Sequence, residues 1–79
     1  MTLITVNEAR IDMEGHAVQI FDGSPIRLKV KIAKAARDMW RTALGEEPPA
    51  EEVEAADVIT EFFNRADAHL EINKHEVEI

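Results

Sequence analysis

An apolar stripe with helical spacing runs between residues 49 and 69 and limits the folds open to the chain. Residues three, four and seven positions apart share one side of a helix, so this spacing predicts one long amphipathic helix. Its apolar arc consists of Ala55, Ala56, Ile59, Phe62, Phe63, Ala66 and Leu70. Pro49 suits the first helical position, where its missing N–H has no role. Such a helix is stable only when the rest of the chain covers its apolar arc.

A second helix is predicted over residues 33–44. Its apolar positions recur at helical spacing, and they are Ala33, Ala36, Trp40 and Leu44. Gly45 follows as the residue type that most often ends a helix. Residues 46–49, Glu-Glu-Pro-Pro, predict a rigid connector to the helix at 49–69.

Short strands are predicted before the helices, and the tail after the helices has two possible structures. Strand-forming residues predict strands at 2–6, 10–13 and 17–21, the last two joined as a hairpin by the turn at 14–16. The tail, residues 70–79, alternates again, which fits either a last strand or a loose end.

Residues 26–31 allow two interpretations. Ile26, Leu28 and Val30 alternate with basic residues, which is the period of a strand. Ser24 followed by Pro25 is also a good helix start, with serine as N-cap and proline in the first turn. The strict alternation favours a strand at 26–31, paired with 17–21.

These elements together predict a single α+β domain over residues 1–79, in which a small antiparallel sheet of N-terminal hairpins packs against two C-terminal helices. Six large side chains are expected to meet the apolar face of the sheet: Trp40, Leu44, Ile59, Phe62, Phe63 and Leu70. A chain of 79 residues builds only a small core, which favours burial by pairing. A homodimer is therefore expected as one assembly of this chain.

The cellular setting is inferred from what the sequence lacks. The chain contains no cysteine, so disulfides cannot stabilise it, and this fits a reducing compartment. No apolar run is long enough to cross a membrane, and residues 1–6 do not resemble a signal peptide. The expectation is a cytoplasmic protein without a membrane partner.

Charge is segregated along the chain, whose net charge is −7. Residues 26–41 hold six basic residues and one acidic residue, a net charge of +5. Residues 46–79 hold eleven acidic residues and two basic residues, a net charge of −9. This acidic excess opposes direct binding to nucleic acid by the molecule as a whole.

The acidic residues of the second helix predict a partner-binding surface. Glu54, Asp57 and Glu61 lie on the side of the helix opposite its apolar arc. The candidate partner-binding residues are Glu47, Glu51, Glu54, Asp57, Glu61 and Glu71. A rigid row of carboxylates resembles a row of phosphates and fits a basic surface on a nucleic-acid-binding protein. The plainer alternative is that these residues are only the solvated side of an amphipathic helix.

The basic segment has a functional alternative of its own. With a strand at 26–31, Arg27, Lys29 and Lys31 project from one face, followed by two helices. The order strand–helix–helix over residues 26–70 resembles the ribbon-helix-helix DNA-binding fold, which dimerises through its strands. That resemblance implies a DNA-binding regulator. The acidic start of the second helix departs from the family pattern, because it would repel phosphate.

Catalytic, cofactor and metal signatures are not found in the sequence. His16, His69 and His75 lack the spacing of metal ligands. Ser24 is explained as a cap or turn residue, and no Gly-x-Ser-x-Gly pattern is present. The expectation is a protein that is not an enzyme and that needs no cofactor or metal.

The function predicted from these observations is that of a small acidic protein-binding module, an inhibitor or modulator of a nucleic-acid-processing complex. In size, acidity and lack of cysteine the chain is similar in general type to phage-encoded inhibitors, including anti-CRISPR proteins. Those proteins share no common motif, so the likeness assigns no residue. Two alternatives stay open: the DNA-binding regulator, and a structural subunit whose opposite charges pair between copies.

Overall fold

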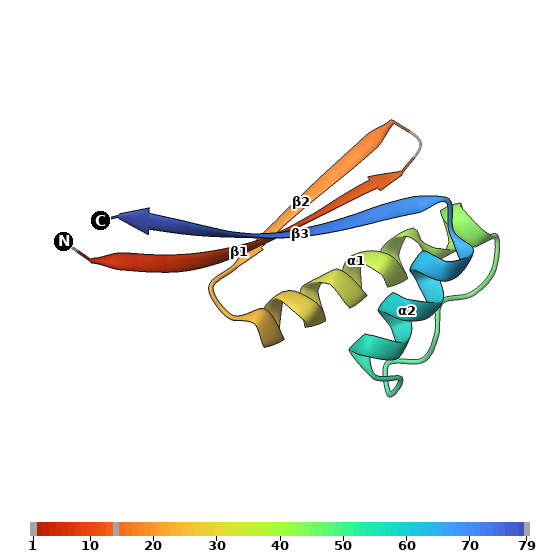
Figure 1. The fold of residues 1–79 in the computed structure, drawn as a ribbon. Coiled ribbons are helices and arrows are strands. Elements are labelled where there is room, and N and C mark those ends of the chain that lie inside the picture. The colour runs from red at the N-terminus through yellow and green to blue at the C-terminus, as the bar shows by residue number, and fades with distance from the viewer. Residues whose placement is uncertain (1, 14, 79) are drawn as a thin grey trace.

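The computed structural model describes residues 2–13 and 15–78, and it is an α+β fold as predicted. Its elements in chain order are β1 (Leu3–Met13), β2 (His16–Asp22), α1 (Pro25–Leu44), α2 (Ala55–Arg65) and β3 (Ala68–Glu78). The three strands form one antiparallel sheet in the order β2-β1-β3 (Figure 1). The chain thus builds two strands, then both helices, and returns to the sheet with its last strand.

β1 is one continuous strand, where two strands at 2–6 and 10–13 were predicted. Residues 7–9 are extended although asparagine and glutamate are poor strand formers, because β1 lies in the centre of the sheet. It pairs with β2 from Asn7↔Asp22 to Met13↔His16, and with β3 from Leu3↔Glu78 to Met13↔Ala68. The hairpin is confirmed, and of the two alternatives for the tail, the strand is correct.

The predicted strand at 26–31 is wrong, because this segment begins α1. The Ser24 hydroxyl accepts a hydrogen bond from the Arg27 N–H at 3.3 Å, and Pro25 lies in the first turn. Leu28 and Ile32 are four apart and buried, whereas Ile26 is 77% exposed. The apolar alternation therefore includes two residues with helical spacing, and the Ser24 cap and the burial of this pair both favour the helix.

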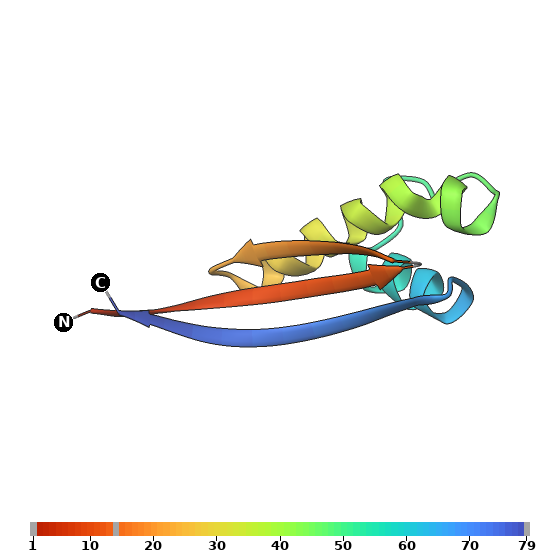
Figure 2. The same cartoon turned by 90° about the horizontal axis from the view of Figure 1, so that it is seen from above.

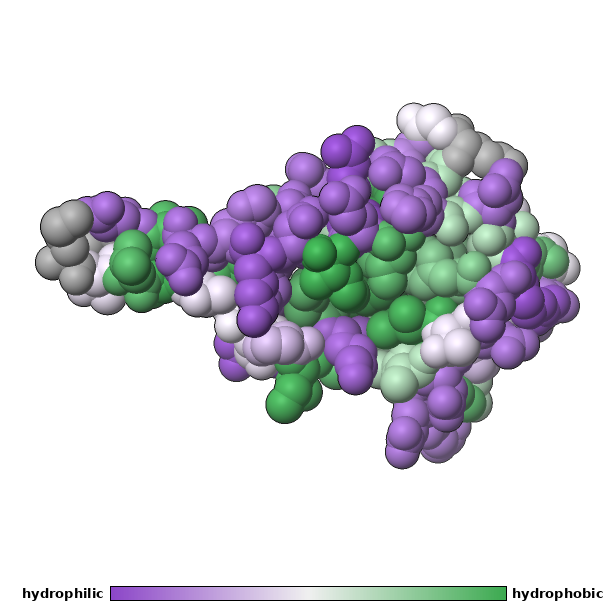
Figure 3. Space-filling view, in the orientation of Figure 1, coloured by the Kyte–Doolittle hydropathy of each residue, from purple (hydrophilic) through white to green (hydrophobic). Residues whose placement is uncertain are grey.

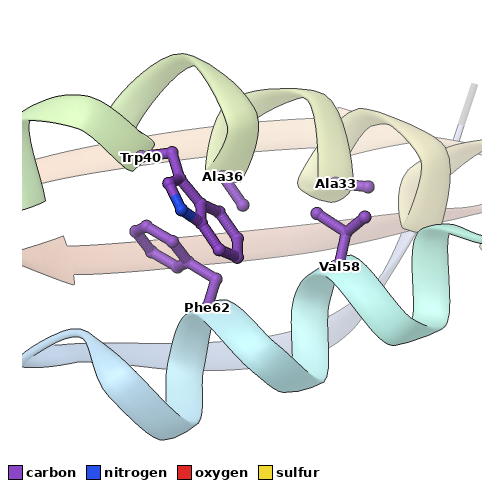
Figure 4. Close-up of a cluster of buried hydrophobic side chains, with 5 residues drawn as sticks. All are labelled: Ala33, Ala36, Trp40, Val58 and Phe62. Carbon is purple, nitrogen blue, oxygen red and sulfur yellow. The ribbon is translucent and has the colours of Figure 1, made fainter. Parts of the chain in front are cut away.

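The helix predicted at 49–69 is shorter than expected and runs only from Ala55 to Arg65. α1 ends at Gly45, whose φ of 68° is left-handed and whose N–H donates to the Arg41 carbonyl at 2.9 Å. Figures 1 and 4 show that α1 and α2 run in the same direction. A parallel neighbour requires a return connection along the length of the helix, so residues 46–54 serve as that connection and lie outside α2.

Two clusters of buried apolar side chains form the core. The helix cluster lies between α1 and α2 and consists of Ala33, Ala36, Trp40, Val58 and Phe62 (Figure 4). The sheet cluster lies between the sheet and α1 and consists of Ala9, Ile11, Leu28 and Ile32.

Of the predicted core residues, Trp40 and Phe62 are buried, and their ring centroids are 5.6 Å apart. The other four, Leu44, Ile59, Phe63 and Leu70, are partly buried and pack against these clusters. Val58 is fully buried but was not predicted as a core residue.

Both helices lie on the same face of the sheet, and the opposite face is left uncovered (Figures 1 and 2). β2 ends opposite Asn7, so residues 3–6 of β1 pair only with β3. These paired ends project from the body as a two-stranded arm that carries both termini (Figure 1).

Candidate protein-binding surface

Three of the predicted partner-binding residues line one hollow between α2 and the connector. Glu47 comes from the connector, and Asp57 and Glu61 come from α2. The hollow has a volume of about 290 Å³, and its apolar wall is formed by Trp40, Pro49, Val53 and Val58. The structure therefore brings together carboxylates that are up to fourteen positions apart in the chain, over a floor that includes buried apolar side chains.

Helix geometry positions the two carboxylates from α2. Asp57 and Glu61 are four residues apart, so they point from the same side of the helix. Val58 lies between them and anchors this side of α2 to the core, since it is fully buried. Asp57 lies in the first turn, where the helix dipole favours a negative charge.

Arg37 positions the connector beside α2. Its Nη2 donates to the Ala50 carbonyl at 3.2 Å and to the Val53 carbonyl at 2.9 Å. One guanidinium on α1 therefore satisfies two carbonyls of a segment that forms no helix or strand of its own. Glu51 lies between these two residues in the chain, so the contact with Arg37 also fixes the backbone on either side of Glu51.

Some acidic residues of this region are paired with the chain's own arginines. Arg41 Nη2 lies 2.7 Å from Glu47 Oε1, and Arg65 pairs with Glu46 and, at 3.6 Å, with Glu61. The Arg65 guanidinium lowers the pKa of Glu46, and Glu46 in turn raises the pKa of Arg65.

Glu51, Glu54 and Asp57 differ from these arginine-paired residues. They are exposed, and within residues 2–13 and 15–78 they form no ion pair. Partial self-neutralisation therefore leaves a continuous negative segment from the connector into the first turn of α2.

Glu71 is separate from the other five predicted residues. It lies on β3 opposite Arg10, between Leu70 and Ile72. Successive side chains of a strand point to opposite faces, and Leu70 packs on the helix side against the sheet cluster. Glu71 therefore faces the uncovered side of the sheet and does not belong to the same surface as Asp57.

The basic segment is not the one-faced ribbon that a strand at 26–31 predicted. In α1, Arg27 and Lys31 are four apart and both reach Asp22 at the end of β2, at 3.1 and 2.8 Å. The Ser24 N–H also donates to Asp22 at 2.8 Å. Lys31 first, then the Ser24 N–H and Arg27, hold the pKa of Asp22 well below its usual range.

This Asp22 cluster was not predicted, because the alternation at 26–31 favoured a strand. Helical spacing of Arg27 and Lys31, four positions apart behind Asp22 and Ser24, was the signal that could have revealed it. Val58 and Trp40 as walls of the acidic hollow were also missed, since the sequence places them only in an apolar pattern.

The histidines lie apart, and His75 Nε2 lies 2.8 Å from Glu8 Oε1 on the uncovered face of the sheet. Within the described residues no group of three or more side chains is arranged to hold a metal ion. No helix among the described residues is long and apolar enough to span a membrane.

No protein-family model, curated protein or solved structure matches this chain.

Proposed function

We propose that this protein is a protein-binding module that inhibits or modulates a nucleic-acid-processing complex through its acidic surface, defined as Glu47, Glu51, Glu54, Asp57 and Glu61. The observation that carries the proposal is the negative segment made by Glu51, Glu54 and Asp57 beside the hollow, which forms no ion pair with the residues that the structure describes. Glu71 is not part of this surface, because it faces the other side of the sheet.

The geometry favours a protein partner over a small ligand. The carboxylates stand on a rigid helix and on a connector held by Arg37, so their arrangement is fixed before binding. Fixed charges speed the encounter with a basic surface and exclude acidic partners. Apolar side chains in the hollow, among them Val53, which is 37% exposed, add contact area that a purely charged surface lacks.

The experiment is affinity capture from cells of the organism that encodes the chain, followed by mass spectrometry. The bait is the wild-type protein or the triple variant Glu54→Lys/Asp57→Lys/Glu61→Lys. The matched control, Glu71→Lys/Glu76→Lys/Glu78→Lys, makes the same change in charge on β3. A milder variant, Glu54→Gln/Asp57→Asn/Glu61→Gln, removes charge without adding lysines near the helix N-terminus.

The expected result is a nucleic-acid-binding protein that the wild type and the β3 control capture and that both α2 variants lose. The purified partner should release a fluorescent DNA or RNA duplex when the wild-type protein is added, and salt should weaken this competition. Circular dichroism checks that each variant is folded. Capture that is unchanged by the triple reversal in folded protein would disprove the proposal.

A further inference from the structure

A second hollow lies on the helix side of the sheet, away from the acidic surface. α1 has 20 residues and is about 30 Å long, whereas α2 has 11 residues and is about 16 Å long. α2 therefore covers only part of α1 and of the sheet. Where this cover ends, a groove of about 510 Å³ lies between the N-terminal turns of the two helices and β3. This volume lies within the range typical of small-molecule sites, about 300–1,000 Å³.

The groove is apolar along its length. Its walls include Leu28 and Ile32 of α1, Ile59 of α2, and Leu70 and Ile72 of β3. Figure 3 shows apolar side chains gathered in the middle of this face, with hydrophilic side chains on either side of them. Ile72 is 57% exposed, so water contacts a large apolar side chain that a ligand would cover.

Polar groups occur at defined points of this apolar groove. Lys29 of α1 and Lys74 of β3 both line it, and both are exposed. Neither lysine forms an ion pair with any residue in the described part of the chain. Asn7 is the cross-strand neighbour of Lys74, lines the groove, and is only 4% exposed. Two cations therefore lie beside an apolar groove in a protein whose net charge is −7.

We propose that this groove binds a single-chain amphiphile with an anionic headgroup, of the fatty-acid class. The alkyl chain lies along Leu28, Ile32, Ile59 and Ile72, and the carboxylate lies between Lys29 and Lys74. The two lysines select a negatively charged headgroup, and the apolar walls of the groove select an alkyl chain. The site is distinct from the acidic surface, so either one can be correct without the other.

The test is a titration of the purified protein with dodecanoate below its micelle concentration, followed by isothermal calorimetry and by backbone amide NMR shifts. Saturable binding of one dodecanoate per chain is expected, with shifts at the groove residues. Decanoate should bind about tenfold more weakly, because two buried methylenes are lost. Dodecyltrimethylammonium, which has the same chain and the opposite charge, should bind at least about tenfold more weakly than dodecanoate.

Variants separate the headgroup from the chain. Lys29→Ser/Lys74→Ser should weaken dodecanoate binding about tenfold. Lys34→Ser, on the same helix but outside the groove, should leave it unchanged. Ala56→Trp, which places a large side chain at an exposed position of the groove wall, should abolish binding. Thermal unfolding verifies that each variant is folded.

Several outcomes would overturn the proposal. They are absence of saturable dodecanoate binding, equal binding of the cationic amphiphile, and an unchanged affinity in the double lysine variant. A dimer in sedimentation that Ala56→Trp converts to a monomer would instead assign the groove to a second copy of the chain.

Discussion

The two ends of α1 are held in different ways. At its C-terminal end, Trp40 packs against Phe62 of α2, and the contact is apolar and fully buried. At its N-terminal end, Arg27 and Lys31 bind Asp22, and the apolar groove beside them stays open. The first end is closed by the hydrophobic effect. The second end is anchored to the sheet by the buried Leu28 and Ile32, but it adds solvated polar contacts to Asp22 and borders the open groove.

The difference shows how a chain of 79 residues divides its few large side chains. Closing one end uses both Trp40 and Phe62, whereas Phe21, whose carbonyl contacts Lys31 near the other end, is 50% exposed. The two proposed binding sites lie beside the open end and at the acidic connector. The predictions below test this contrast.

The largest effect is expected at the closed end. Phe62→Ala removes a fully buried ring from the contact with Trp40 and leaves a cavity between the helices. The free energy of unfolding should fall by about 3–5 kcal/mol. Urea denaturation followed by Trp40 fluorescence measures it. A loss below about 1 kcal/mol would show that the helix cluster is not the main stabilising contact.

A smaller effect is expected where α1 ends. Gly45 has a φ of 68°, and a Cβ there meets nothing within 4 Å, so Gly45→Ala brings only backbone strain. Stability should fall by about 1–2 kcal/mol. Gly23→Ala is the control, because its φ is not left-handed and its Cβ meets only the Thr5 carbonyl at 3.7 Å. Thermal unfolding of both variants should show a loss only for Gly45→Ala.

The ion pairs of Asp22 at the open end should depend on pH, whereas the apolar contact between Trp40 and Phe62 should not. The pKa of Asp22 is lowered on folding. Asp22 therefore stabilises the fold at pH values above its unfolded pKa of about 3.9, and this stabilisation is lost progressively as the pH falls below that pKa. Asp22→Asn should thus lower stability at pH 7, and its difference from wild type should shrink below pH 4. Lys31→Met should reproduce part of this loss, because Lys31 is the first cause of the shift.

The effect of Asp22→Asn should be smaller than that of Gly45→Ala, since both basic partners of Asp22 are at least half exposed to water. Denaturation of Phe62→Ala over the same pH range provides the comparison. A Phe62→Ala difference that followed pH as strongly would contradict the division between the two ends.

The smallest effect is expected on the groove wall. Ile72→Ser changes a side chain that is 57% exposed, so the free energy of unfolding should change by no more than about 0.5 kcal/mol. The same measurement as for Phe62→Ala applies. A large loss of stability would mean that Ile72 contributes to the core, and it would contradict an open groove at this end of α1.

Much of the fold could be predicted from residue types and spacing. The α+β class, the hairpin between β1 and β2, the stop at Gly45 and the burial of Trp40 and Phe62 follow from local patterns. These features depend on neighbours within a few positions, where turn chemistry and periodicity act directly.

The errors arose where distant contacts choose between local alternatives. At 26–31 both a strand and a helix fitted the pattern, and in the helix Leu28 and Ile32 are both buried in the cluster with Ala9 and Ile11 of β1. At 49–54 the sequence favoured helix, but the parallel packing of α2 on α1 requires those residues as a return connection held by Arg37.

For the candidate surface, the sequence determined which residues are acidic and that Asp57 and Glu61 share one side of a helix. Only the tertiary structure placed Glu47 beside Asp57 and Glu71 on the far side of the sheet. Spacing along one helix is fixed by its own geometry, whereas proximity between segments depends on the path of the chain between them. That path is set by packing of the whole molecule, which no short stretch of sequence contains.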